Sequence, residues 1–344
     1  MTPEEHTPAS EAEIIELFSR LFAPRITPSD LLIGIGDDAA AIEPGVDPDT
    51  KFVITADMLV EDVHFRRSIH SPYDIGWRTA VANLSDIAAM GAAPRWGILT
   101  LALPGLITTD WLEQFATGLR DAMAKYDAQV IGGDLARSPE RVVASLTILG
   151  ETTGRLVMRT GAELGDLIAV TGYLGGGAAG LALLESDEAD LPEDVRKAVI
   201  DAHLRPLPRV WAGHVFASHK GIHAMMDISD GLGIDLGRLC EASGVGARMR
   251  EDLFPIRSET LEVAEALNRD PLEFVNGGED FELLVVGAEG AVRNAAKVLS
   301  DDPAPIPVTI LGEIIDPHFG MHLLRVDQTV VDPSSYGWDH FQKR

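Results

Sequence analysis

The chain has 344 residues, of which 46% are hydrophobic, so it can bury a large core and we expect two domains. Its formal net charge of −26 argues against a nucleic-acid partner, and an anionic substrate would be repelled unless metal ions offset that charge. The single cysteine, Cys240, excludes a disulfide framework and a cysteine-based metal site. No apolar run reaches the roughly 18 residues of a membrane span, and the first residues are acidic, so we expect a cytoplasmic protein with no membrane partner.

Predicted strands and helices alternate along the first half of the chain. The expected elements are an amphipathic helix over 14–22, a strand over 51–56 that ends at Asp57, a helix over 74–91, a strand over 96–103, a helix over 109–126, and strands over 128–131 and 142–150. This alternation predicts an α/β domain. A change of composition over 151–165 places the boundary between a first domain of residues 1–150 and a second of residues 151–344.

The second half begins with a predicted strand over 167–171, a glycine-rich turn at Gly172–Gly177 and a helix. Such a turn presents backbone N–H groups at a helix start, so it either binds phosphate or only lets the backbone turn. A later strand ends at Asp227, and a helix begins near Ser229 or Asp230, which are good N-cap residues. The last predicted strands cover 281–286, 308–314 and 321–326.

Asp86 is the only charged residue between Arg78 and Arg95, in a run of apolar and small residues. A helix with so few charges is buried on most of its surface. An ionised carboxylate is rarely placed there without a cation to hold it. The helix over 74–91 therefore predicts a metal-binding carboxylate at Asp86.

Other aspartates stand beside glycines or at apparent strand ends, and with Asp86 they make the set Asp38, Asp57, Asp86, Asp134, Asp227 and Asp230. Any single one of them can be a turn or cap residue, but so many together favour a magnesium site that holds a polyphosphate. The chain has no Walker-type phosphate loop and no lysine in a glycine loop. In a phosphoryl-transfer enzyme, metal ions would then supply most of the charge neutralisation.

His64 follows Asp62 by two residues, which invites a metallohydrolase interpretation. No second histidine lies at metal-ligand spacing, so a zinc site is disfavoured. His64 can be a general base, a phosphate contact or a structural residue, and we favour a substrate contact. Ser85 and Ser229 lack a recognisable Ser–His–acid arrangement, which leaves nucleophilic catalysis without support.

Eight segments in order resemble the thiamine-monophosphate kinase family, within the superfamily that includes aminoimidazole ribonucleotide synthetase. They are GIGDDAAAI, TADMLVEDVHF, AVANLSDIAAMGAAP, IGGDLARS, RTGAELGD, DISDGLGIDL, GGEDFEL and YGWDHF, and they run from about Ile33 to Phe341. The resemblance implies a two-domain α/β (PurM-like) fold, a homodimer formed by the N-terminal sheet, and ATP bound near the junction of the domains.

The resemblance also implies the roles of individual residues. The implied magnesium ligands are Asp38, Thr55, Asp57, Asp86, Asp134, Asp227 and Asp230; the ATP-binding residues are Gly133, Asp134, Arg159 and Ser229; the substrate-binding residues are His64, Glu279 and Trp338. Trp338 would stack on the thiamine rings and an acidic residue would face the thiazolium cation. Ala56 stands where the family usually has a hydroxyl residue, so that side-chain oxygen is lost.

The implied reaction is transfer of a phosphoryl group from ATP to thiamine monophosphate, giving thiamine diphosphate, the last step of its biosynthesis. No general base is assigned, because the acceptor phosphate has a second pKa near ~6 and is largely ionised at pH 7. Two alternatives stay open: another ATP-dependent member of the superfamily, and a non-catalytic sensor of thiamine phosphates or nucleotides. The aspartate set favours an enzyme over a sensor.

Overall fold

The computed structural model describes residues 31–33, 40–43, 49–105, 107–186 and 190–333. The predicted helix over 14–22 and the predicted site residues Asp38 and Trp338 lie outside the described residues. None of the described helices is both long enough and apolar enough to cross a membrane.

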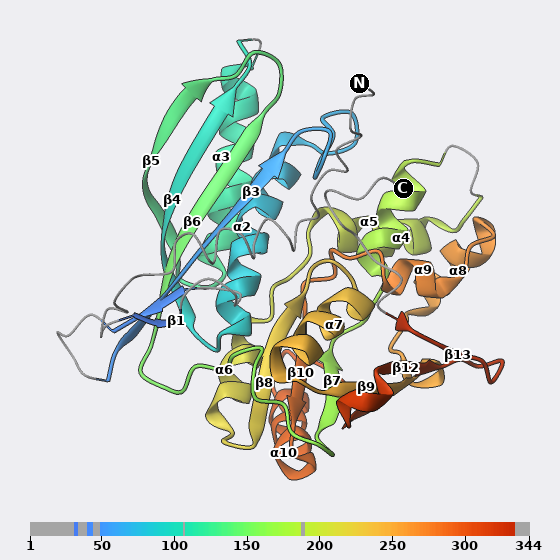
Figure 1. Ribbon diagram of the computed structural model, residues 1–344. Helices are drawn as coiled ribbons and strands as arrows, with labels where there is room; N and C mark the ends of the chain where they lie inside the picture. The colour runs from blue at the N-terminus through green and yellow to red at the C-terminus, as the bar shows by residue number, and fades with distance from the viewer. Residues whose placement is uncertain (1–30, 34–39, 44–48, 106, 187–189, 334–344) are drawn as a thin grey trace, which may run out of the picture.

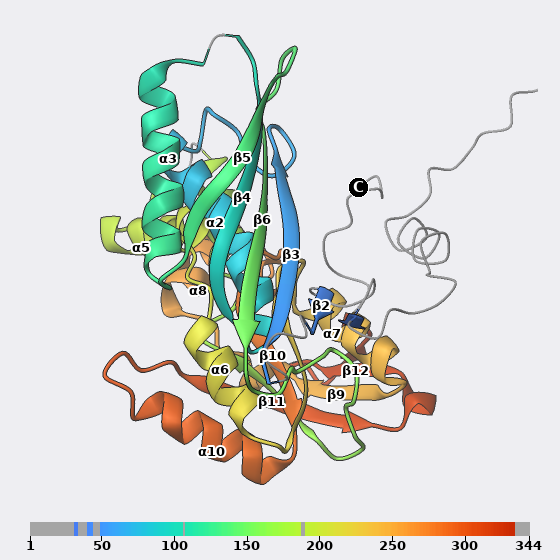
Figure 2. The same cartoon turned by 90° about the vertical axis from the view of Figure 1, so that its left-hand side faces the viewer.

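The first half of the chain forms a sheet with the strand order β1-β2-β3-β6-β4-β5. Its strands are β1 (Leu31–Ile33), β2 (Ala40–Ile42), β3 (Lys51–Val60), β4 (Ala93–Leu103), β5 (Gln129–Arg137) and β6 (Val143–Thr152). All neighbours are antiparallel except β4 and β5, which are parallel. The helices α2 (Pro72–Ala89) and α3 (Thr109–Ala124) cover one face of this sheet (Figures 1 and 2).

The second half forms another sheet, with the order β13-β12-β9-β11-β7-β10-β8. Its strands are β7 (Leu167–Thr171), β8 (Ile222–Ile228), β9 (Gly246–Arg250), β10 (Glu282–Gly287), β11 (Val308–Ile315), β12 (Met321–Leu324) and β13 (Val330–Val331). The accompanying helices are α4 (Gly176–Leu184), α5 (Glu193–Leu204), α6 (Val210–Ser218), α7 (Leu232–Ser243), α8 (Ser258–Ala266), α9 (Pro271–Val275) and α10 (Glu289–Ser300), with short 3₁₀ turns at Glu251–Leu253 and Pro317–Phe319. Both halves are mixed α/β layers, as predicted.

Two predicted strands are longer than the sequence indicates. β3 continues through Asp57 to Val60 because its pairing with β6 is unbroken from Lys51 to Val60. β5 runs through Gly132–Asp134 to Arg137, because β4 pairs with it along that whole length. Asp57 and Asp134 therefore lie inside strands, and the expectation that they follow strand ends is wrong.

Helix α2 begins at a capping box, in which Ser71 and Asp74 satisfy each other's backbone N–H groups, and Pro72 occupies the first turn. Every α2 residue except Pro72, Tyr73 and Asp86 is buried. Glycines allow its close packing: a Cβ at Gly118 of α3 would lie 2.0 Å from Tyr73 O, and one at Gly213 of α6 would lie 2.0 Å from Ala88 O. The sequence prediction of a buried helix is confirmed.

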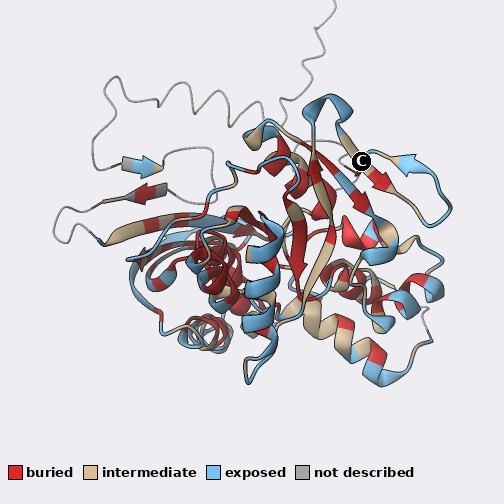
Figure 3. Cartoon of the chain, turned by 90° about the horizontal axis from the view of Figure 1, so that it is seen from below, coloured by how far each residue is buried: buried red, intermediate tan, exposed pale blue. Residues whose placement is uncertain are grey.

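Helix α2 also contacts the second half of the molecule. Trp77 Nε1 donates to Pro206 O at 2.9 Å, and Arg205 Nε donates to Asp74 Oδ1 at 2.7 Å. The C-terminal end of α2 shares a buried apolar cluster with α6, β8 and β10. Figure 3 shows how the buried residues, in red, concentrate on the inner strands and helices of both halves.

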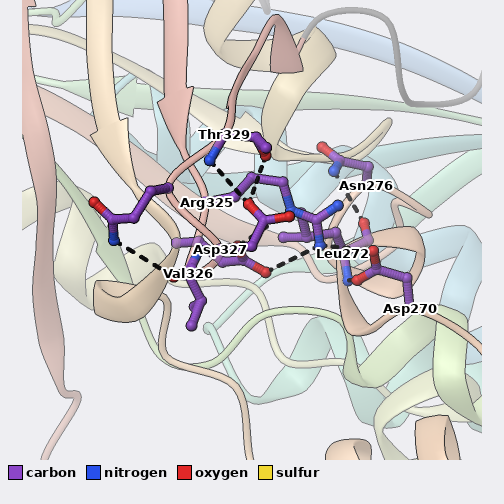
Figure 4. Close-up of polar contacts among 9 residues, drawn as sticks. Asp270, Leu272, Asn276, Arg325, Val326, Asp327 and Thr329 are labelled. Carbon is purple, nitrogen blue, oxygen red and sulfur yellow. Dashed lines mark hydrogen bonds and ion pairs between the residues drawn. The ribbon is translucent and has the colours of Figure 1, made fainter.

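Polar contacts connect the chain after β12 of the second sheet to helix α9. Arg325, after β12, donates to Asp270 Oδ2 at 2.7 Å, and Asp270 Oδ1 caps α9 by accepting from Leu272 N at 3.0 Å (Figure 4). The hydrogen bonds that Arg325 donates to Glu251 and Asp270 raise the pKa of its guanidinium. Helix α9 is followed directly by residues 276–281, so these contacts fix one end of that loop.

Candidate functional site

A cavity of about 300 Å³ lies between the two halves of the molecule. It is lined by Asp57, Leu59, Val63, His64, Phe65, Arg66, His70, Arg78, Ala82, Leu181, His203, Ser229, Asp230, Gly277, Glu279 and Phe281. Five of these are residues that the sequence predicts for the site: Asp57, His64, Ser229, Asp230 and Glu279. They come from four separate segments of the chain, so only the folded structure brings them to one cavity.

The first half contributes β3 and α2 to this cavity. Thr55 and Asp57 alternate along β3 and so share one face of the strand. Thr55 Oγ1 donates to Asp86 Oδ2 at 2.5 Å, which shows that this face is turned toward α2. Asp86, Ala82 and Arg78 are spaced by four residues, so they form one stripe along α2. Asp86 therefore lies on the same helix face as two residues that line the cavity.

The second half contributes a loop between β8 and α7 whose shape depends on Asp235. The Asp235 side chain is fully buried, and its Oδ2 atom accepts from the backbone N–H groups of Ser229, Asp230 and Gly231 at 3.0–3.1 Å. Arg238 pairs with both Asp235 and Asp230. Gly231, with φ +111°, is the N-cap of α7, so the helix begins later than the predicted Ser229 or Asp230.

The loop that carries Glu279 packs against the same segment. Glu279 N donates to Ser229 O at 2.7 Å, and the backbone at Glu279 has φ +65°, in the left-handed region that non-glycine residues rarely adopt. The Glu279 carboxylate forms an ion pair with Arg78 and lies 3.4 Å from His203 Nδ1. Glu279 is thus held by residues from both halves of the molecule.

The hydrogen bonding of His64 limits what it can do. Its Nδ1 atom accepts from Val60 N at 3.0 Å, so in the neutral ring the proton sits on Nε2. A neutral His64 is then a donor toward the cavity rather than a proton acceptor. Of the three roles that the sequence leaves open, this geometry favours a contact with an anionic group over general-base catalysis.

Comparison with known proteins agrees with this arrangement. Two family models match the chain: the N-terminal domain of AIR synthase related proteins over residues 36–152, and their C-terminal domain over residues 163–322. The thiamine-monophosphate kinase of Bacillus subtilis is 34% identical over 321 residues, covering 91% of this chain and 95% of the relative. The thiamine-monophosphate kinase of Escherichia coli K12 is 36% identical over 332 residues, covering 95% and 97%. This chain belongs to the thiamine-monophosphate kinase family.

A solved structure of AaThiL complexed with AMPPCP and TMP has a TM-score of 0.81 and 32% sequence identity, and the match covers 96% of this chain and 97% of that one. A thiamine-monophosphate kinase from Stenotrophomonas maltophilia has a TM-score of 0.71 and 34% identity. These likenesses confirm the predicted family, its two-domain fold and the predicted enzyme class, a kinase.

The glycine-rich turn predicted as a possible phosphate cradle is used differently in this member of the thiamine-monophosphate kinase family. Asp280 accepts from Gly175 N at 2.8 Å and from Gly177 N at 3.2 Å, so a carboxylate already occupies these donors. Burial raises the pKa of Asp280 to about 7 against the opposing effect of the two glycine N–H groups. Gly176, Gly177 and Asp280 line a second cavity of about 270 Å³. The turn positions the backbone, and its phosphate-binding interpretation is not supported.

Four other residues predicted for the kinase site do not line the cavity of this chain: Gly133, Asp134, Arg159 and Asp227. Asp134 on β5 pairs with Thr100 on β4, and Thr100 pairs with Ser145 on β6. Asp57 on β3 pairs with Leu146, the next residue of β6. Because neighbouring residues of a strand point to opposite faces, Asp134 and Asp57 lie on opposite faces of the sheet. Gly133 and Asp134 on β5 are three strands from β3, roughly 14 Å at about 4.8 Å per strand. Arg159 and Asp227 do not line the cavity either. For these four residues the predicted roles stay predictions.

The oxygen donors around the site suit magnesium better than a softer metal. Thr55, Asp57, Asp86 and Asp230 offer hydroxyl and carboxylate oxygens, the ligands that Mg²⁺ shares with phosphate and water. Within the described residues, no three His, Cys, Asp or Glu side chains are gathered closely enough to hold a metal ion by themselves. A site completed by phosphate oxygens is consistent with this open arrangement.

The sequence interpretation missed four charged or histidine residues that line the cavity: Arg66, Arg78, His70 and His203. Arg78 had a detectable signal, because it lies two helical turns before Asp86 on the same stripe of α2. His70 and His203 carry no comparable signal, since they meet only through the packing of α5 against the segment that precedes α2.

Replacing Asp235 by Asn should lower the free energy of unfolding by roughly 2–4 kcal/mol, because it removes a buried charge that satisfies three backbone donors and an arginine. Asp230→Asn is the matched control: the same change at the partly exposed partner of Arg238 should cost less than about 1 kcal/mol. Urea denaturation without added Mg²⁺ measures both. Equal losses in the two variants would contradict the anchoring role of Asp235.

Proposed function

We propose that this kinase transfers a phosphoryl group from ATP to the phosphate of thiamine monophosphate, forming thiamine diphosphate and ADP. The observation that carries the proposal is the cavity, because it brings residues expected at the metal and ATP end, Asp57, Ser229 and Asp230, next to residues expected at the acceptor end, His64 and Glu279. The relatives named as thiamine-monophosphate kinases, and the likeness to AaThiL complexed with AMPPCP and TMP, support the same substrates.

The two sides of the cavity suit the two charges of thiamine monophosphate. His64 and Arg66 offer donors to a phosphate group on the side formed by residues 57–66. Glu279 offers a carboxylate to the thiazolium cation. We propose that Trp338 stacks on the rings of the same substrate, as the resemblance of the C-terminal segment implies.

No residue needs to remove a proton from this acceptor, because a phosphate monoester is largely a dianion at pH 7. The difficulty is to hold a dianion against the γ-phosphate of ATP, so positioning and charge neutralisation carry the catalysis. His64, with its proton on Nε2, would orient the acceptor phosphate. We propose direct in-line transfer, without a phosphorylated enzyme residue.

We propose that Asp38, Thr55, Asp57, Asp86, Asp134, Asp227 and Asp230 hold several Mg²⁺ ions. When bound, the ions would neutralise the phosphate oxygens that the acidic protein otherwise repels. The Thr55–Asp86 contact supports this, because it holds two of the proposed oxygen donors together beside Asp57. Gly133, Asp134, Arg159 and Ser229 are the proposed ATP contacts.

We also propose a homodimer that forms through the first sheet. Helices cover one face of that sheet, and none of the described elements covers the other (Figure 2). Every residue of the edge strand β5 is exposed, including Ile131, and so are Trp96 and Ile98, which share one face of the neighbouring β4. An uncovered apolar face next to an unpaired edge strand is typical of an interface.

Light scattering at micromolar concentration should give about twice the chain mass of 37.0 kDa. Ile131→Asp, at a residue with 58% exposure on β5, should shift the protein to monomers, because it places a charge in the apolar face. Val298→Asp on α10, at 45% exposure, is the matched control and should leave the dimer intact. A wild-type monomer would exclude the proposed dimer.

Asp57→Asn and Asp86→Asn should each lower turnover by more than roughly a hundredfold while the protein stays folded, because each removes a proposed magnesium ligand. Asp62→Asn is the control: Asp62 lies five residues after Asp57, is paired with Arg141 and does not line the cavity. Activity is measured as ADP release across a Mg²⁺ titration. Near-normal rates for Asp57→Asn and Asp86→Asn at low millimolar Mg²⁺ would argue against the metal site.

The acceptor specificity tests the proposed function as a whole. Thiamine monophosphate should be phosphorylated and free thiamine should not, because an alcohol of pKa near ~16 needs a general base, whereas neutral His64 presents a donor rather than an acceptor. The protein is incubated with ATP, Mg²⁺ and each acceptor, and the products are separated by chromatography, with Asp57→Asn as the control for contaminating kinases. Thiamine diphosphate formed from free thiamine, or no product with either acceptor, would contradict the proposal; the second result would favour a sensor.

A further inference from the structure

Arg78 holds one oxygen of the Glu279 carboxylate, and His203 lies near the other. Arg78 Nη2 donates to Glu279 Oε1, and Arg78 Nη1 donates to His203 O at 2.5 Å. His203 Nδ1 lies 3.4 Å from Glu279 Oε2. Arg78 belongs to α2 of the first half, while His203 ends α5 and Glu279 precedes β10 in the second half. The carboxylate is therefore oriented from both halves at once.

The contact between His203 and His70 determines how His203 faces Glu279. Their Nε2 atoms lie 3.0 Å apart, so one of the two must donate and the other accept. Burial and the charge of Arg78 lower the pKa of both rings, that of His70 to about 4, so both are neutral at pH 7. If His70 donates through Nε2, His203 keeps its proton on Nδ1, the atom that lies 3.4 Å from Glu279 Oε2. The opposite assignment would place a nitrogen lone pair against Glu279 Oε2.

We propose that Arg78 is the positioning residue for Glu279, and that Arg78 and His203 together fix the carboxylate where it meets the cationic part of the acceptor. The inference rests on the proposed function, in which Glu279 contacts thiamine monophosphate. Arg78 would not touch the reacting phosphates. It would act through Glu279, so its removal should affect the binding of the acceptor and leave the binding of ATP unchanged.

Burial distinguishes this contact from an ordinary surface ion pair. Arg78 is only 2% exposed, whereas the Glu279 side chain is 28% exposed and opens into the cavity. Among the described residues, Arg78 Nε and His203 Nδ1 are buried and lack a partner with hydrogen-bond geometry. Such unsatisfied donors are costly, and native structures keep few of them. The ion pair between Arg78 and Glu279 is therefore shielded from solvent on the arginine side and open to the cavity on the carboxylate side.

The backbone of the loop that carries Glu279 is also closely constrained. Gly278 and Glu279 both have positive φ, and a Cβ at Gly177 would lie 2.7 Å from Glu279 O, so the main chain of the loop is closely fitted. The Glu279 side chain still has three rotatable bonds. Arg78 supplies the charged partner that selects one orientation among them.

Steady-state kinetics of Arg78 variants test the proposal. Arg78→Gln should raise the KM for thiamine monophosphate by roughly tenfold or more, the scale of a hydrogen bond to a charged group, with kcat and the KM for ATP within about threefold of the wild type. Arg78→Lys keeps the charge but loses the guanidinium that donates to both Glu279 and His203 O, so it should raise the KM for thiamine monophosphate by about threefold. Arg67→Gln, at an arginine paired with Glu61 away from the cavity, is the control and should change neither KM.

A double-mutant cycle shows whether Arg78 acts through Glu279. If it does, Arg78→Gln combined with Glu279→Gln should have the same KM for thiamine monophosphate as Glu279→Gln alone, within about twofold. Additive effects, or an unchanged KM in folded Arg78→Gln, would overturn the positioning role. If Arg78→Gln does not fold, Arg78→Lys decides: a rise limited to thiamine monophosphate supports the proposal, and no rise or an equal rise for ATP overturns it.

The same measurements separate this inference from the proposed function. A wild-type protein that makes no thiamine diphosphate would refute the proposed function, and the role of Arg78 with it. An active wild type whose KM for thiamine monophosphate does not respond to Arg78→Gln would refute the positioning role alone.

Discussion

The close packing of α2 between the two sheets is the constraint on which the site depends. Glycines at 118 and 213 let α3 and α6 approach its backbone, and the capping box at Ser71 fixes where the helix begins. One stripe of this helix carries Arg78, Ala82 and Asp86. Because α2 contacts both halves, the same rigid element sets the distance between β3 and the loops of the second half.

The carboxylates around the cavity fall into two groups with different physical roles. Asp235 and Glu282 are buried and Asp280 is partly buried. Asp235 accepts from three backbone N–H groups, Asp280 from two glycine N–H groups, and Glu282 from Arg209 and Thr171. They fix the loops. Asp57, Asp230 and Glu279 reach the cavity instead. An acidic protein can keep such a site only where cations balance the charge, which is why metal ions and a cationic substrate suit it.

The two ends of the proposed site are built from different kinds of structure. β3 and α2 supply the oxygen donors Thr55, Asp57 and Asp86 from regular secondary structure, which holds them rigidly. The proposed acceptor end is built from loops, with His64 after β3 and Glu279 on a left-handed backbone. Loops would allow the specificity for the acceptor to change without disturbing the proposed metal-binding end.

The sequence by itself determined the family, the burial of α2 and most of the candidate residues. These depend on periodic patterns and short motifs, which can be recognised from residues that are close together in the chain. It misjudged where Asp57 and Asp134 lie in their strands, since strand length depends on pairing with β6 and β4. It also missed that Asp280 occupies the glycine-rich turn. Only the tertiary structure brought Arg78 to His203, 125 residues along the chain, and to Glu279, because contacts so distant in sequence arise from packing and leave no periodic signal.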